Sequence, residues 1–235
     1  MNQNELDQKV QDLANNNHIS VLEAKTKYLT LQSNTNNNNN NNDESSSLFD
    51  SNLLTQLNPS GFFFQYDKFE TKYDDRAKQY YIDLGDNLSL RPLRRDDYER
   101  DYMKLLSQLT EIGNVTKGDY EKRFDQMKSC DGTYYTCVVE DTNLNKIVAS
   151  TTLVYEQKFI RNTGARGRVE DVVVDVAYRG KRLSKILLDV VGQLSEKLGC
   201  YKVSLECKDH LKKHYEQFGF LAEDKQNYLC RRFVH

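Results

Sequence analysis

The stretch that decides the fold is R-V-E-D-V-V-V-D-V-A-Y-R-G-K-R-L-S-K-I-L-L-D-V-V, residues 168–191. Its valine run, residues 172–174, is short enough for a buried strand, and a compact polar turn, residues 179–184, follows at once. After the turn, apolar residues recur at helical spacing: Ile186, Leu187, Val190, Val191, Leu194 and Leu198. The stretch therefore predicts a strand, a tight basic loop and a helix, in that order.

This order directs backbone N–H groups of the loop and the N-terminus of the helix toward one point. Such a point binds phosphate, because first-turn amides lack helical partners and the helix dipole is positive there. Arg179, Lys181, Arg182 and Lys185 add positive charge beside it. Neither G-x-x-x-x-G-K-[ST] nor G-x-G-x-x-G is present. The pattern predicts a polyphosphate site, and a basic helix N-terminus at the surface remains the alternative.

Charge balance, hydropathy and cysteine spacing argue against a nucleic-acid-binding, membrane or disulfide-rich secreted protein. The chain has 33 Lys and Arg against 35 Asp and Glu, which favours neither nucleic acid nor a membrane surface. No apolar run approaches the roughly 20 residues of a membrane span, and the first residues lack the features of a signal peptide. Five cysteines without C-x-x-C spacing predict reduced thiols, not a disulfide frame or a zinc site. We expect a cytoplasmic protein.

The N-terminal part, residues 1–87, is expected to be a low-complexity, largely disordered extension. Ser20-x-x-Glu23 is a capping box that predicts a short helix, and an asparagine and serine tract over residues 34–47 predicts a linker. Two apolar patches follow, L-F-D-S-N-L-L at residues 48–54 and three phenylalanines at residues 62–64. They either dock onto the folded part or remain loose, and a partner-binding motif is the alternative.

The folded domain is predicted to span residues 88–235. Strands are expected at residues 88–93, 134–139, 147–155, 170–174, 201–207 and 228–234, and helices at residues 98–109, 116–127, 186–198 and 211–218. Residues 159–168 are expected to form a polar connector, and Thr116-x-x-Asp119 a capping box. The fold class is α/β, a mixed sheet with helices on both faces.

This order of elements resembles that of the GNAT acetyltransferases. Their pyrophosphate loop reads Q/R-x-x-G-x-G/A: Arg179 matches its first position, Arg182 stands where the middle glycine usually falls, and Ser184 occupies the small sixth position. Further segments resemble the glucosamine 6-phosphate N-acetyltransferases within this superfamily: L-R-P-L, L-T-E-I-G, V-V-E-D, K-F-I-R, R-V-E-D-V-V-V, C-Y-K-V-S-L-E-C, Y-E-Q-F-G-F and Y-L-C-R-R-F. The resemblance covers residues 88–235, and L-F-D-S-N-L-L is similar to an extension of the animal members.

The resemblance implies transfer of the acetyl group of acetyl-CoA to the amine of D-glucosamine 6-phosphate. The products would be N-acetyl-D-glucosamine 6-phosphate and CoA, formed by direct attack in a ternary complex on the route to UDP-N-acetylglucosamine. It also implies a homodimer whose last strand crosses to the partner's site. A GNAT acting on another amine, such as a protein N-terminus or a polyamine, and a non-catalytic acyl-CoA-binding module are the alternatives.

The central strand and the loop after it are the expected coenzyme site. The strand would separate from its neighbour, pair with the pantetheine arm and polarise the thioester carbonyl through its N–H groups. The predicted coenzyme-binding residues are Val172, Val173, Val174, Arg179, Gly180, Lys181, Arg182, Leu183, Ser184, Lys185 and Tyr215. The resemblance gives Tyr215 the role of hydrogen-bonding or protonating the coenzyme thiolate, and a tyrosine packed beneath the final strand is the alternative.

Glu170 and Glu206 stand at ends of neighbouring predicted strands, and the resemblance makes them the acidic groups around the substrate amine. For Glu170 and Asp171, a solvated strand end or a salt bridge with Arg168 is the alternative. Lys158, Arg161 and Arg232 are the candidate cations for the sugar phosphate, with Thr110 as a hydroxyl donor; for each cation, an ordinary surface charge is the alternative. The predicted substrate set is completed by Phe159, Ile160, Asp171 and Val172.

Two histidines lie at the last predicted helix, His210 just before its first residue and His214 within it. His210 and His214 have the i, i+4 spacing of a zinc pair, but no H-E-x-x-H pattern or third ligand accompanies them. We expect a solvated helix face and no metal. Leu211, between them, stands where the resemblance leads us to expect an asparagine near the coenzyme.

Overall fold

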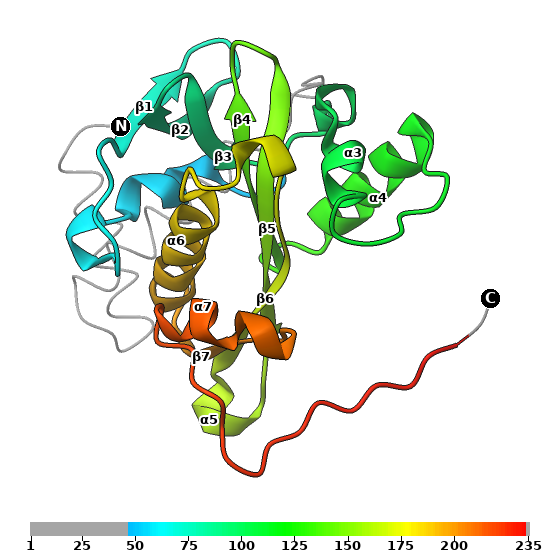
Figure 1. Ribbon diagram of the computed structural model, residues 1–235. Coiled ribbons are helices and arrows are strands. Elements are labelled where there is room, and N and C mark those ends of the chain that lie inside the picture. Colours follow the sequence, from blue (N-terminus) through cyan, green and yellow to red (C-terminus); the bar gives the residue numbers. More distant parts are fainter. Residues whose placement is uncertain (1–46, 234–235) are drawn as a thin grey trace, which may run out of the picture. The chain divides into compact units, whose positions relative to one another are not determined.

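The structure of the protein is a computed structural model that describes residues 47–233 (Figure 1). These residues belong to one unit of the chain, residues 44–235. The predicted capping box at Ser20 and Glu23 and most of the predicted linker lie outside the described residues. No helix in the described part is long and apolar enough to cross a membrane.

One mixed sheet carries the fold, and its strands lie side by side in chain order. Strands β1 to β6 pair antiparallel with their neighbours, and β7 pairs parallel with β6. The strands are β1 (Glu70–Asp74), β2 (Gln79–Gly85), β3 (Leu88–Pro92), β4 (Tyr134–Asp141), β5 (Lys146–Gln157), β6 (Ala165–Val174) and β7 (Cys200–Leu205). The predicted mixed sheet is thus confirmed.

Helices cover both faces of this sheet, with α6 on one side and α3 and α4 on the other (Figure 1). The α-helices are α3 (Tyr102–Leu106), α4 (Lys117–Ser129), α5 (Ile160–Thr163), α6 (Leu183–Lys197) and α7 (Lys212–Glu216). The 3₁₀ helices are η1 (Ser51–Gln56), η2 (Pro59–Gly61), η3 (Asp97–Arg100), η4 (Val176–Tyr178) and η5 (Asp209–Leu211).

Each face of the sheet has its own apolar core. On the α6 face, the side chains at the predicted helical spacing, including Leu187, Val190 and Leu194, are fully buried against the sheet. On the other face, Leu105 of α3 and Phe124 of α4 pack with Ile147 of β5. The 3.6-residue periodicity that predicted α6 therefore describes a real buried face.

The start of α4 follows its capping box. The Thr116 hydroxyl accepts a hydrogen bond from the Asp119 N–H at 3.2 Å, and the Asp119 carboxylate accepts one from the Thr116 N–H at 3.0 Å. The prediction for residues 98–109 was wrong in detail, because two short helices, η3 and α3, meet there instead of one. Asp101 between them has a φ of 62°, a left-handed conformation that interrupts helical hydrogen bonding.

The largest correction concerns residues 47–87, which belong to the fold. Leu48, Leu54 and Phe62 are buried, so docking is the alternative that the structure shows for both apolar patches. Strands β1 and β2 extend the sheet beyond β3. The sequence E-T-K-Y-D of β1 gave no strand signal, because an exposed edge strand needs no apolar face.

Three further boundaries differ from the prediction. Strand β6 begins at Ala165, so residues 165–168 are strand and not connector. The predicted helix over residues 211–218 consists of η5 and α7. Described residues of the predicted last strand, 228–233, form no strand, and Tyr228, Leu229 and Phe233 are exposed. A strand needs a neighbour with which to pair, and this segment has none in the described part of the chain.

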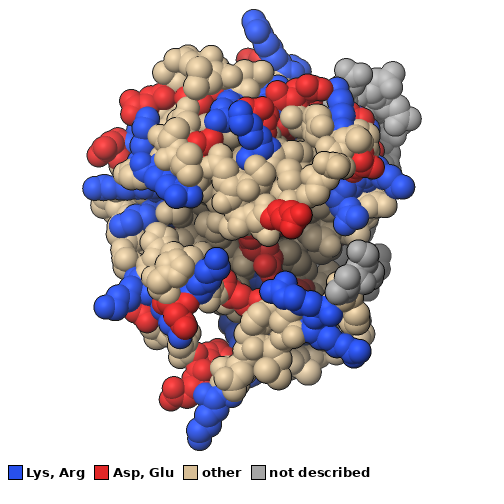
Figure 2. Space-filling view, turned by 45° about the vertical axis from the view of Figure 1, so that its right-hand side comes forward, with Lys and Arg blue, Asp and Glu red and all other residues tan. Residues whose placement is uncertain are grey.

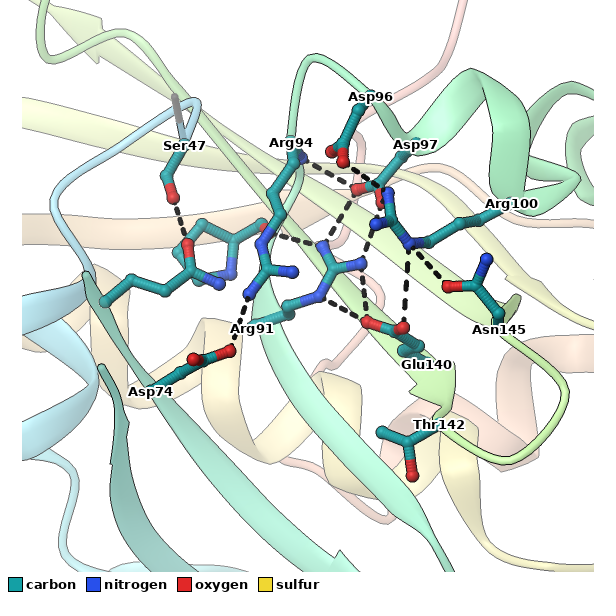
Figure 3. A network of polar contacts seen from close by, with 12 residues as sticks. Ser47, Asp74, Arg91, Arg94, Asp96, Asp97, Arg100, Glu140, Thr142 and Asn145 are labelled. Atoms are coloured by element: carbon teal, nitrogen blue, oxygen red, sulfur yellow. Dashed lines mark hydrogen bonds and ion pairs between the residues drawn. The ribbon is translucent and has the colours of Figure 1, made fainter. Parts of the chain in front are cut away.

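A buried network of charged side chains fixes η3 to the sheet (Figure 3). The Arg91 guanidinium donates to both Asp97 carboxylate oxygens, at 2.8 and 2.7 Å, and to Glu140 at 2.7 Å. Asp97 also accepts a hydrogen bond from the Arg94 N–H at 2.7 Å. These contacts join β3, η3 and β4, and they set where α3 begins.

Candidate active site

The candidate site starts where β6 and β7 stop pairing. The parallel ladder joins Ala165 to Cys200 and ends at Val169 and Leu205, whereas β6 continues to Val174. The described residues of β7 pair with none of β6 beyond Val169. Residues 170–174 therefore keep one open backbone edge, as the sequence predicted for the central strand.

A β-bulge marks the middle of this open stretch. On β5, Ser150 pairs with Val173 and Thr152 pairs with Glu170, so two residues of β6 lie opposite Thr151. Asp171, one of these two, has a φ of 53°. Because a bulge redirects backbone groups out of the regular ladder, the N–H groups near residues 171 and 172 are placed differently from those of a flat strand. No sequence pattern had indicated the bulge.

The basic loop between β6 and α6 has the conformation expected of an anion site. Gly180 has a φ of 85°, and Arg182, the N-cap of α6, has a φ of 62°. The Arg182 carbonyl accepts hydrogen bonds from the N–H groups of Lys185 and Ile186, at 2.9 and 3.1 Å. A positive φ favours glycine, which explains why a glycine would suit the position of Arg182. Earlier N–H groups of the helix remain for a ligand.

The start of this loop is tied to the β4–β5 hairpin. Asp175 pairs with Lys146 at 2.6 Å and accepts the Ala177 N–H at 2.9 Å. The Tyr178 hydroxyl donates to Asp141 at 2.6 Å, and this contact with Asp141, together with burial, raises the pKa of Tyr178 to about 12. These contacts anchor the start of the loop that leads into α6.

The two predicted carboxylates lie around one arginine. Arg168 lies 2.5 Å from Glu170 and 3.5 Å from Glu206, measured between guanidinium nitrogen and carboxylate oxygen. All three side chains are more than a third exposed. The salt bridge with Arg168 is therefore real, and it also brings Glu170 and Glu206 together at the point where β6 and β7 separate. Figure 2 shows a hollow in the middle of one face, with acidic side chains inside and basic side chains around it.

A second group of charges continues along β5 and β6. Glu156 pairs with Lys158 at 2.6 Å and with Arg166 at 2.9 Å. Burial of Glu156 opposes its ionisation, but the hydrogen bonds from Lys158 and Arg166 outweigh this and hold its pKa below the ordinary value. Lys158, a candidate cation for the sugar phosphate, is therefore already paired within this chain.

Five other predicted substrate residues are spread over three places. Arg161 lies 5.8 Å from the centre of the Tyr201 ring, and Phe159 and Ile160 beside it are exposed. Thr110 follows α3 and is exposed as well, as is Arg232 in the C-terminal segment. Described contacts of this chain bring neither Thr110 nor Arg232 to the carboxylate pair.

Tyr215 lies in α7 and is buried. Its ring is 6.3 Å from that of Phe220 and 5.3 Å from that of His214. Burial, and then the neighbouring Cys207, raises the pKa of the Tyr215 hydroxyl, so it stays protonated at neutral pH. Cys207 directly follows Glu206, and the tyrosine is therefore near the end of β7 where the carboxylates meet.

The two histidines differ: His210 is exposed, as expected for a solvated helix face, whereas His214 is half-buried against neighbouring rings. Its ring lies 5.7 Å from that of Phe218, and burial, followed by the charge of Lys185, lowers its pKa. Leu211, at the N-terminus of α7, is exposed. Within the described residues, no group of three or more histidine, cysteine, aspartate or glutamate side chains could hold a metal ion.

Comparison with known proteins places this geometry in a family. The model of the Acetyltransferase (GNAT) family matches residues 90–220. The chain belongs to this GNAT family. Its sheet is similar to that in the crystal structure of glucosamine-6-phosphate N-acetyltransferase from Arabidopsis thaliana, with a TM-score of 0.59 and 35% identity over 63% of this chain and 99% of that one. The predicted GNAT fold and the predicted family are confirmed.

Curated relatives narrow the position within the GNAT family. The chain is 50% identical to the probable glucosamine 6-phosphate N-acetyltransferase of Drosophila melanogaster over 57% of its own length and 61% of the relative's. It is 42% identical to glucosamine 6-phosphate N-acetyltransferase 1 of Dictyostelium discoideum, over 58% of this chain and 87% of that one. These relatives confirm the predicted enzyme class, an N-acetyltransferase of the glucosamine 6-phosphate type.

Proposed function

We propose that the chain transfers the acetyl group of acetyl-CoA to the amine of D-glucosamine 6-phosphate, giving N-acetyl-D-glucosamine 6-phosphate and CoA. The observation that carries the proposal is the open edge of β6, which leads from the basic loop at one end to the Glu170 and Glu206 pair at the other. The names of the relatives support the choice of substrate.

The coenzyme would be bound mainly by backbone groups. The pyrophosphate accepts hydrogen bonds from the first N–H groups of α6, and Arg179, Lys181 and Arg182 supply charge. The pantetheine arm pairs with the open edge of β6 over residues 172–174. An N–H group beside the bulge then donates to the thioester oxygen, where negative charge grows as the amine attacks.

The acetyl group moves in one direct displacement. The neutral amine attacks the thioester carbon, the carbon–sulfur bond breaks, and the acetyl group stays on nitrogen. Glu170 and Glu206 hold the amine and help to take up its proton. Tyr215 donates a hydrogen bond or its proton to the departing thiolate, which its raised pKa permits because the phenol is protonated beforehand.

The sugar phosphate would be held by Lys158, Arg161 and Arg232. We place Arg232 in the site of a second copy in a homodimer. The reason is that the C-terminal segment is exposed, and so are its apolar side chains Tyr228, Leu229 and Phe233. A strand formed there on dimerisation would bury these side chains. The enzyme would work in the cytoplasm and supply UDP-N-acetylglucosamine synthesis, in keeping with its unpaired cysteines.

A thiol-release assay with three amines tests this function. The same enzyme is given acetyl-CoA with glucosamine 6-phosphate, glucosamine or spermidine, and free CoA is followed. We expect turnover with glucosamine 6-phosphate to exceed the other two by far. Preference for spermidine would show a different GNAT substrate, and binding of acetyl-CoA without turnover of any amine would favour a non-catalytic module.

A further inference from the structure

The segment that contains η1 and η2 runs beside α6 and is held to it by hydrogen bonds (Figure 1). The N–H of Asn58 donates to Gln193 at 2.8 Å. Further along, Asp189 accepts the Phe63 N–H at 2.9 Å and the Tyr66 hydroxyl at 2.5 Å. Asp189 is itself buried in α6. The backbone at Phe63 therefore has a fixed position on this helix.

That position borders the coenzyme loop. Lys185 and Asp189 are four residues apart and share one face of α6, about one turn or ~6 Å along the axis. Lys185 belongs to the first turn, and its ammonium lies 3.7 Å from the centre of the Phe64 ring and 3.4 Å from the Gln217 side-chain oxygen. The three-phenylalanine patch thus reaches the end of α6 at which the pyrophosphate would bind.

Phe63 differs from its neighbours in what its ring contacts. Phe62 is buried in the core, whereas Phe63 is 63% exposed although its backbone is fixed. Its ring packs against the residues that follow α7. The ring centre lies 6.2 Å from that of Phe218, and a Cβ added to Gly219 would lie 3.3 Å from the Phe63 Cζ atom. An aromatic ring is therefore presented to solvent from a rigid support.

We propose that Phe63 and Lys185 form the subsite for the adenosine end of acetyl-CoA. The Phe63 ring stacks on the adenine, and the Lys185 ammonium faces a coenzyme phosphate. One ribose separates the pyrophosphate from the adenine in CoA, so a pyrophosphate on the first turn of α6 leaves the base within reach of this side of the helix. The inference rests on the proposed function, since it presumes that the loop binds the pyrophosphate.

The chemistry of the surface fits a nucleoside better than an aliphatic ligand. Bases stack on aromatic side chains through their π-faces, whichever base is present. Lys185 gives this surface a cation, and His214, which faces Lys185 and Phe218 from α7, is kept neutral by burial and by that cation, which lower its pKa. An aromatic face beside a single lysine charge matches adenine next to phosphate.

The test compares acetyl-CoA with S-acetyl-4'-phosphopantetheine, which keeps the thioester and one phosphate but lacks adenosine. Calorimetry measures both affinities for the full-length wild type and for Phe63→Ala, Phe63→Trp and Leu144→Ala. Leu144 is 65% exposed in the β4–β5 hairpin and provides a matched surface control. We expect Phe63→Ala to weaken acetyl-CoA binding about tenfold and leave the fragment unchanged. Phe63→Trp should keep the wild-type affinity, and Leu144→Ala should change neither ligand.

Equal affinity losses for both ligands in Phe63→Ala, or no loss for either, would overturn the subsite. The same calorimetry separates this failure from that of the proposed function. A wild type that binds acetyl-CoA without acetylating glucosamine 6-phosphate would refute the activity, while the Phe63 variants still decide the subsite. A wild type that does not bind acetyl-CoA would overturn both.

Discussion

Two clusters among the described residues gather carboxylates around one arginine, and they differ in burial. In the first, Arg91 and Asp97 are 1% and 0% exposed as side chains, with Glu140 beside them (Figure 3). In the second, Arg168, Glu170 and Glu206 are 37%, 38% and 46% exposed. Both clusters join an arginine to carboxylates, so the contrast shows what burial changes.

In the buried cluster, every partner is needed. Burial disfavours both charged forms, yet Arg91 lowers the pKa of Asp97, and Asp97 with Glu140 raises the pKa of Arg91. Removing one partner leaves an uncompensated charge away from water. In the exposed cluster, water screens the same attraction, so each pair contributes little to stability and the carboxylates remain available to a ligand. The first cluster holds the fold, and the second can serve chemistry.

Asp97→Ala should have the largest effect. It leaves the Arg91 guanidinium buried with one partner fewer, so the free energy of unfolding should fall by about 3–5 kcal/mol in urea titrations at pH 7. Asp125→Ala is the control, because Asp125 pairs with Arg95 at the surface. A loss no greater than the control's would mean that the buried cluster contributes no more than a surface pair.

Tyr215→Phe should affect catalysis and not folding, unlike the change at Asp97. The variant keeps the packed ring but has no proton to give, so turnover should fall about 100-fold, roughly 2.7 kcal/mol of barrier. Steady-state kinetics and calorimetry would show this fall with acetyl-CoA affinity barely changed. Normal turnover with a lower melting temperature would instead make Tyr215 a structural residue.

Lowering the pH should destabilise the protein through Asp97, a carboxylate of the buried cluster. Its folded pKa is lowered, so the stability that it contributes is present above the unfolded pKa, about 3.9, and is lost as pH falls through the folded pKa. Unfolding of wild type and Asp97→Asn between about pH 6 and pH 2 measures this loss. The variant should start less stable and lose less on acidification. If stability fell in parallel with pH in the wild type and in the variant, the loss could not be assigned to Asp97.

Arg168→Met should have the smallest effect on stability. It breaks the pairs of Arg168 with Glu170 and Glu206 and its 3.7 Å contact with Glu156, and the free energy of unfolding should change by less than about 1 kcal/mol. Its kcat/KM for glucosamine 6-phosphate should nevertheless shift several-fold, because Glu170 and Glu206 lose the cation between them. A stability loss of several kcal/mol with unchanged kinetics would show that the exposed cluster, like the buried one, stabilises the fold and takes no part in the reaction.

Local patterns predicted the parts of the fold that depend on local hydrogen bonding and periodicity. The apolar spacing from Ile186 to Leu194 gave α6, and Thr116 with Asp119 gave the start of α4. Polar strand β1 was missed because its pairing with β2 is the reason it is a strand. The bulge at Asp171 was missed for a similar reason, since it is defined by register against β5.

The sequence by itself determined the strand, basic loop and helix around residues 168–191, the family, and Glu170, Glu206 and Tyr215 as candidates. The strand, loop and helix follow from residue types at short spacing, and the family with its candidate residues follows from the resemblance of many separate segments. Tertiary structure alone decided that Arg91 is buried and Arg168 exposed, that Phe63 stands beside α6, and that a bulge interrupts β6 at Asp171. The physical reason is that burial, and with it the strength of a charge pair, depends on segments far apart in the chain.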